Sequence, residues 1–126
     1  MSASLYIVAT PIGHLDDMSL RAIDVLRSVN LIAAEDTRHS SKLLRHFDIR
    51  TPLISYHDHS ETSDFEGMLK RLRAGETIAL ISDAGTPLVS DPGYKLVVAC
   101  HQEQIPVVPI PGPSATITAL SAAGLP

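Results

Sequence analysis

Residues 77–93 read TIALISDAGTPLVSDPG. The first five are uncharged and rich in β-branched side chains, which is typical of a short strand buried on both faces of a parallel sheet. Residues 82–93 are dense in turn formers, and Asp91 can cap a helix whose first position is Pro92. Open α/β sheets bind ligands where the carboxyl end of a strand meets a helix N-terminus, so we predict a ligand loop here. An ordinary strand-to-helix connection is the alternative.

The rest of the chain alternates short apolar segments with helical patterns. We predict strands near residues 5–9, 30–34, 53–56, 77–81 and 106–110, and helices near 19–29, 60–74, from Asp91 onward, and 114–123. The first helix is predicted to bury Leu20, Ile23, Val25, Leu26 and Val29, and the helix at 60–74 to begin at Ser60, stop at Gly75 and bury Phe65, Met68, Leu69 and Leu72. This alternation predicts an α/β fold: a five-stranded, mainly parallel sheet with helices on both faces.

Composition and charge limit the class of protein. The 126 residues are 44% hydrophobic, enough for one core, so we predict a single domain over residues 1–126. The lone Cys100 excludes an internal disulfide and favours a packed thiol in a reducing compartment, the cytoplasm. The N-terminus lacks a signal-peptide pattern, and prolines fragment the uncharged segment 105–126, so we expect no membrane span. The net charge of −4 argues against holding RNA by long-range attraction alone.

Three further turn-rich segments follow predicted strands at their carboxyl ends. They read TPIGH (10–14), EDTR (35–38) and PIPGPS (109–114). Together with residues 82–93 they outline one rim of the sheet, where glycine and proline allow a ligand to approach the backbone closely. None of these segments matches the dinucleotide fingerprint or the phosphate loop of nucleotide-hydrolysing enzymes.

These segments also resemble a known family. The set TPIG (10–13), AEDTR (34–38), SDAGTP (82–87), DPG (91–93) and PGPSA (111–115) is similar to the tetrapyrrole methylase superfamily, in order and spacing over essentially the whole chain. The sequences of the AEDTR and SDAGTP motifs most resemble those of the bacterial branch that methylates small-subunit ribosomal RNA. The resemblance implies S-adenosylmethionine (SAM) as the methyl donor, held between two α/β lobes. It further implies that residues 1–126 are the N-terminal lobe, that the C-terminal lobe is absent from this chain, and that the piece is inactive alone.

The reaction implied by the resemblance is 2′-O-methylation of a cytidine ribose in the 16S rRNA of the small ribosomal subunit, carried out by a homodimer. The implied SAM-binding residues are Pro11, Gly13, Asp83, Ala84, Gly85, Thr86, Pro111, Gly112 and Ser114. His14 departs from the family, which usually carries Asn there, so a polar contact at this position stays open. Two alternatives also stay open: a superfamily enzyme with another acceptor, such as a corrinoid or porphyrin precursor or a diphthamide intermediate, and a non-catalytic nucleotide-binding module.

The chemistry of methyl transfer indicates which side chains matter. The donor carbon must come to about 3 Å from the hydroxyl oxygen, and a group must remove the hydroxyl proton. The candidate catalytic residues are Glu35, Asp36 and Arg38. Asp83, and behind it His57 and His59, are further candidate bases, and Thr86 is a further candidate for positioning the substrate. Adjacent side chains at a strand end diverge, so we expect one carboxylate to face the cleft and the other to cap a helix or to pair with Arg38. The sequence assigns no unique general base.

A basic segment follows these acidic residues. Between positions 38 and 50 stand Arg38, Lys42, Arg45 and Arg50 against Asp48 alone, a net charge of +3. In a helix the first three share one face, which suits the phosphate backbone of the substrate RNA; a solvated helix face is the alternative.

The motif His57-Asp58-His59 has two possible uses. Its histidines alternate as metal ligands do in an extended segment, but no third ligand stands at a fixed spacing, so we expect no metal site. We predict that His57 and His59 contact the RNA, with a plain exposed loop as the alternative.

Overall fold

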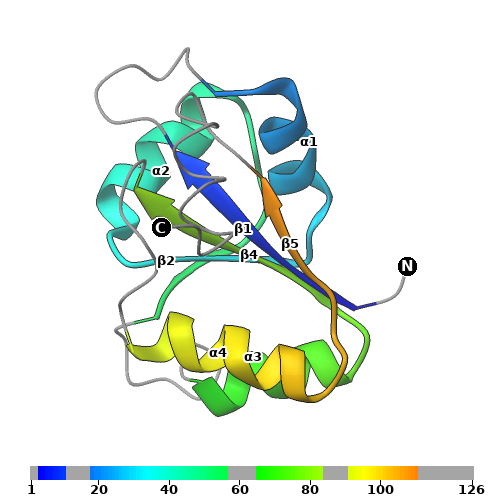
Figure 1. Cartoon of the computed structure of the whole chain (residues 1–126). Helices are drawn as coiled ribbons and strands as arrows, with labels where there is room; N and C mark the ends of the chain where they lie inside the picture. Colours follow the sequence, from blue (N-terminus) through cyan, green and yellow to red (C-terminus); the bar gives the residue numbers. More distant parts are fainter. Residues whose placement is uncertain (1–2, 11–17, 57–64, 84–90, 111–126) are drawn as a thin grey trace, which may run out of the picture.

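The computed structural model describes residues 3–10, 18–56, 65–83 and 91–110, in which strands and helices alternate (Figure 1). The elements are β1 Ser4–Thr10, α1 Leu20–Ser28, β2 Leu31–Ala34, α2 Thr37–His46, β3 Leu53–Ser55, α3 Phe65–Arg73, β4 Thr77–Asp83, α4 Asp91–Gln102 and β5 Val107–Ile110. Every predicted strand is present, close to its expected position. The helix predicted at 114–123 lies outside the described residues. Ser60, the predicted first residue of the helix at 60–74, also lies outside them.

The five strands form one sheet in the order β3-β2-β4-β1-β5. All four neighbouring pairs are parallel, which confirms the predicted α/β fold. Strand β4 lies at the centre, between β1 and β2, and Ile78, Ala79, Leu80 and Ile81 are at most 5% exposed. This double burial explains why the segment TIALI carries no charge.

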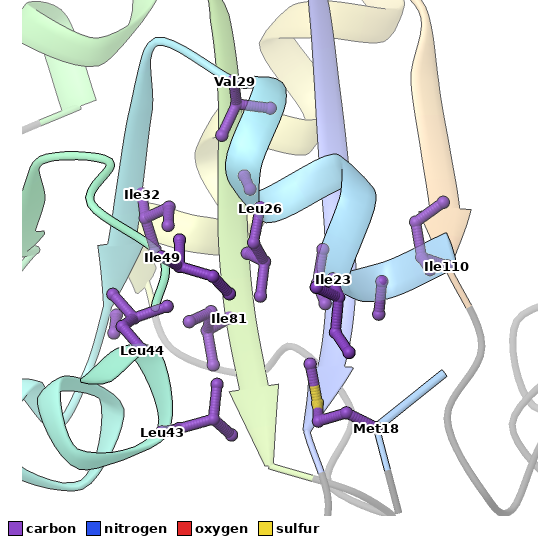
Figure 2. Close-up of a cluster of buried hydrophobic side chains, with 14 residues drawn as sticks. Met18, Ile23, Leu26, Val29, Ile32, Leu43, Leu44, Ile49, Ile81 and Ile110 are labelled. Carbon is purple, nitrogen blue, oxygen red and sulfur yellow. The ribbon is translucent and has the colours of Figure 1, made fainter. Parts of the chain in front are cut away.

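Helices cover both faces of the sheet, as predicted. Helices α1 and α2 lie over one face and α3 and α4 over the other (Figure 1). Successive side chains of β4 point to opposite layers: Ala79 and Ile81 pack with α1 and α2, whereas Ile78 and Leu80 pack with α3 and α4. Figure 2 shows the first of these layers, in which Leu26 from α1 and Leu43 from α2 point toward the sheet.

Helix α1 corrects one predicted burial. Its N-cap is Ser19, whose hydroxyl accepts a hydrogen bond from the Ala22 backbone N–H at 3.0 Å. The predicted Ile23, Leu26 and Val29 are buried, but Leu20 is 81% exposed and Val25 only half-buried. At 100° per residue Leu20 lies about 130° from the centre of the buried stripe, and Ala22 takes the inward position instead.

Helices α3 and α4 pack side by side on the opposite face. Met68, Leu69 and Leu72 are buried as predicted, Phe65 is half-buried, and α3 is followed by Gly75 at a φ of +96°, the expected left-handed stop. The Arg73 guanidinium donates two hydrogen bonds, of 2.8 and 2.7 Å, to the Glu103 carboxylate that follows α4.

Cys100 is fully buried in α4, as the sequence predicted for a packed thiol. Burial raises the pKa of this thiol to about 11, so it stays protonated and unreactive near neutral pH. None of the helices in the described part of the chain has the length and apolarity needed to cross a bilayer.

Candidate functional site

The carboxyl ends of the strands converge on one edge of the sheet. Thr10, the last residue of β1, is in register with Asp83, the last residue of β4, and Val8 is in register with Ile110 at the end of β5. The chain continues from these three adjacent strands into the three segments predicted to bind SAM. Of the predicted SAM-binding residues, Asp83 is thus placed at this edge. The others lie outside the described residues: Pro11, Gly13, Ala84, Gly85, Thr86, Pro111, Gly112 and Ser114.

The topology marks one position on this edge. After β1 and β2 the chain passes to α1 and α2 on one face of the sheet, whereas after β4 it passes to α4 on the other face. Strand β4 lies between β1 and β2, so the direction of the connections reverses on both of its sides. In open α/β sheets ligands bind at such a switch point, outside the carboxyl ends of the strands. The switch point therefore lies at the carboxyl end of β4, where Asp83 is the last described residue.

The two acidic candidates differ in their local roles. Glu35 directly follows β2 and is exposed. Asp36, also exposed, is the N-cap of α2: its Oδ1 accepts hydrogen bonds from the backbone N–H groups of Arg38 at 3.0 Å and His39 at 3.4 Å. Of the two roles expected for the second carboxylate, a helix cap or an ion pair with Arg38, Asp36 takes the first. It accepts its hydrogen bonds from backbone N–H groups.

The basic residues of α2 gather on one open pocket of about 520 Å³. It is lined by Asp36, Arg38, His39, Ser41, Lys42 and Arg45. The predicted clustering of Arg38, Lys42 and Arg45 is thereby confirmed. Arg50 lies beyond the end of α2 and does not line the pocket; its guanidinium pairs with Asp48 at 3.3 Å. His39 and Ser41 also line the pocket but were not among the predicted site residues. Around the helix axis they lie on the two sides of the basic stripe, so helical spacing could have indicated them.

The remaining predicted site residues are three histidines. His57 and His59, the predicted RNA contacts, and His14 lie outside the described residues. Among the residues that the structure does describe, no group of three or more His, Cys, Asp or Glu side chains is placed to hold a metal ion.

The chain belongs to the Tetrapyrrole (Corrin/Porphyrin) Methylases, whose family model matches residues 4–126. A crystal structure of uroporphyrin-III-C-methyltransferase from Thermus thermophilus shares the fold, with a TM-score of 0.65 at 22% identity over 99% of this chain and 54% of that chain.

Within this family, the chain is similar to proteins named Ribosomal RNA small subunit methyltransferase I. It is 60% identical over 122 residues to the one from Escherichia coli O157:H7, covering 97% of this chain and 43% of the relative. It is 59% identical over 122 residues to the one from Vibrio cholerae serotype O1, covering 97% of this chain and 42% of the relative. The chain therefore spans less than half the length of these relatives.

Proposed function

We propose that the chain is the N-terminal α/β domain of a two-lobed, SAM-dependent methyltransferase. The full-length protein, a cytoplasmic homodimer, methylates the ribose 2′-oxygen of a cytidine in 16S rRNA within the small ribosomal subunit. Family membership and the high identity to ribosomal RNA small subunit methyltransferases support this proposal.

The observation that carries the proposal is that the SDAGTP segment begins in β4, with Ser82 and Asp83, at the switch point of the sheet. Strand β4 delivers Asp83 to the edge where the connections reverse, next to Thr10 of β1. A methyl donor with an adenosine group needs backbone donors and acceptors at close range, and a segment with a glycine at the point of contact provides them because no Cβ blocks the approach. The segments at 11–13, 83–86 and 111–114 follow or end three adjacent strands, so they are suited to hold SAM together with the second lobe.

Methyl transfer from SAM to a ribose hydroxyl requires no covalent bond between the protein and either substrate. Bound SAM supplies an electrophilic methyl group on a sulfonium. The protein must hold the ribose hydroxyl in line with that carbon and accept the hydroxyl proton. Glu35 directly follows β2 at the carboxyl edge of the sheet, and we propose that it faces the acceptor, while Arg38 at the start of α2 orients a neighbouring phosphate.

A glycine substitution tests the donor site. Gly85→Val places a branched side chain where we propose that SAM approaches the backbone, so the full-length variant should lose SAM binding without unfolding. Isothermal titration calorimetry measures the affinity, and circular dichroism of the same sample controls for folding. A folded variant that binds SAM like the wild type removes this loop from the site. A wild-type protein that binds no SAM contradicts the proposed function itself.

A further inference from the structure

We propose that the basic surface of α2, formed by Arg38, Lys42 and Arg45, is the docking surface for the phosphate backbone of the RNA beside the methylated ribose. This inference rests on the proposed function and adds to it the surface of the protein that binds the substrate RNA.

The three side chains form a continuous stripe along the helix. At 100° per residue they fall within an arc of about 60°, and a rise of 1.5 Å per residue spreads them over about 10 Å along the axis. All three are exposed and line the same open pocket. The buried side chains of α2, Ser40, Leu43 and Leu44, lie on the opposite side of the helix. The stripe is thus directed away from the core and is accessible to a large partner.

The three cations of this surface outnumber the carboxylate that lines the same pocket, that of Asp36, whose Oδ1 accepts backbone hydrogen bonds. Arg71 pairs with Glu76 at 2.8 Å and Arg73 pairs with Glu103 at 2.7 Å, whereas no carboxylate in the described part of the chain forms an ion pair with Arg38, Lys42 or Arg45. Helix α2 itself contains no acidic residue. Like charges at i, i+4 destabilise a helix, so this arrangement does not serve the stability of α2. A chain of net charge −4 that concentrates unpaired cations on one helix face presents a surface complementary to a polyanion.

The position of the stripe connects it to the reaction. Helix α2 begins at Thr37, three residues after the end of β2, and β2 lies directly beside β4. The Asp36 cap fixes the first turn of the helix and with it the backbone of Arg38. An RNA strand that lies along the stripe therefore approaches the same edge of the sheet as the switch point. Phosphate contacts of this kind fix the register of a nucleic acid without reading its sequence.

The test neutralises two of the three cations in the full-length protein. Lys42→Gln with Arg45→Gln leaves the catalytic candidate Arg38 in place. The matched control is Lys70→Gln with Lys95→Gln, which removes the same charge from exposed lysines of α3 and α4, on the opposite face of the sheet. Binding to small subunits that lack the modification, and to protein-free 16S rRNA, is measured between 50 and 200 mM salt, together with SAM affinity.

The expected result follows from counterion release. Losing two phosphate contacts should flatten the log-log salt dependence by about 1.5 units and weaken binding by roughly 15- to 20-fold at physiological salt, with SAM affinity unchanged. The lysine control should behave like the wild type.

An unchanged slope for Lys42→Gln with Arg45→Gln, or an equal change in the control, overturns the inference. A loss that appears on the assembled subunit but not on protein-free rRNA also overturns it, in favour of an acidic protein segment as the partner. The proposed function fails separately, if the wild-type protein binds the subunit with the expected salt slope but transfers no methyl group to its RNA.

Discussion

Two substitutions of Asp36, to Asn and to Ala, distinguish a structural role of this residue from a catalytic one. Its Oδ1 accepts two backbone hydrogen bonds at the start of α2, and the side chain is exposed. Asn keeps this capping geometry but cannot accept a proton as a base, whereas Ala removes both abilities. If Asp36 is only a cap, Asp36→Asn should keep both stability and methyl transfer. If Asp36 is the base, Asp36→Asn should keep stability but lose methyl transfer.

The magnitude follows from the geometry of the cap. One hydrogen bond is well formed at 3.0 Å and the other is long at 3.4 Å, so Asp36→Ala should cost about 1 kcal/mol of the free energy of unfolding. An unfolding entropy of about 2.1 cal/mol/K per residue over the whole chain corresponds to a fall in Tm of about 4 °C. Asp36→Asn should lose at most about 0.5 kcal/mol, mainly from the weaker interaction with the helix dipole.

Thermal unfolding by circular dichroism measures both variants, and methyl transfer is assayed in the full-length protein. We expect Asp36→Asn to keep most of its Tm and its activity. If Asp36→Asn melts like Asp36→Ala, the capping argument is wrong. If it melts like the wild type but transfers no methyl group, Asp36 rather than Glu35 acts on the proton.

Two further predictions concern the core. Leu26→Ala should cost about 2–5 kcal/mol in urea unfolding because Leu26 is fully buried, whereas Leu20→Ala on the same helix, 81% exposed, should cost less than about 0.5 kcal/mol; equal effects would contradict the corrected inward face of α1. The Cys100 thiol should react with a thiol reagent at pH 8 only after unfolding. Since the folded state holds its proton up to a pKa of about 11, against 9.0 ordinarily, stability should fall as the pH rises from about 9 to 11. The control is Cys100→Ala, in which the fall over this pH range should be smaller.

The sequence predicted the elements of the fold better than their arrangement. Short apolar segments such as 77–81 marked the strands because burial on both faces excludes charge. Which strands become neighbours depends on the length and face of each crossover, so the central place of β4 and the switch point beside it emerged only in three dimensions. Leu20 was misjudged because hydrophobicity was weighed without its angle around the helix axis.

The candidate site shows the same division. The basic stripe of α2 could be predicted because it depends only on helical spacing, and the structure brings its members to one pocket. The choice between Glu35 and Asp36 could not, because both precede the helix and only the observed hydrogen bonds identify which one caps it. The contacts expected at Gly85 and His57 stay predictions, since both residues lie outside the described ranges.

The central claim is tested most directly by mapping ribose methylation in 16S rRNA. Small subunits from cells that lack the gene are analysed by mass spectrometry of nuclease fragments, before and after incubation with the full-length protein and SAM. We predict that one cytidine lacks its 2′-O-methyl group and regains it in the incubation, and that residues 1–126 alone restore nothing. Ribosomal RNA that stays fully 2′-O-methylated without the gene, together with the loss of a methyl group from a tetrapyrrole or a protein, would contradict the proposal and favour another acceptor within the family.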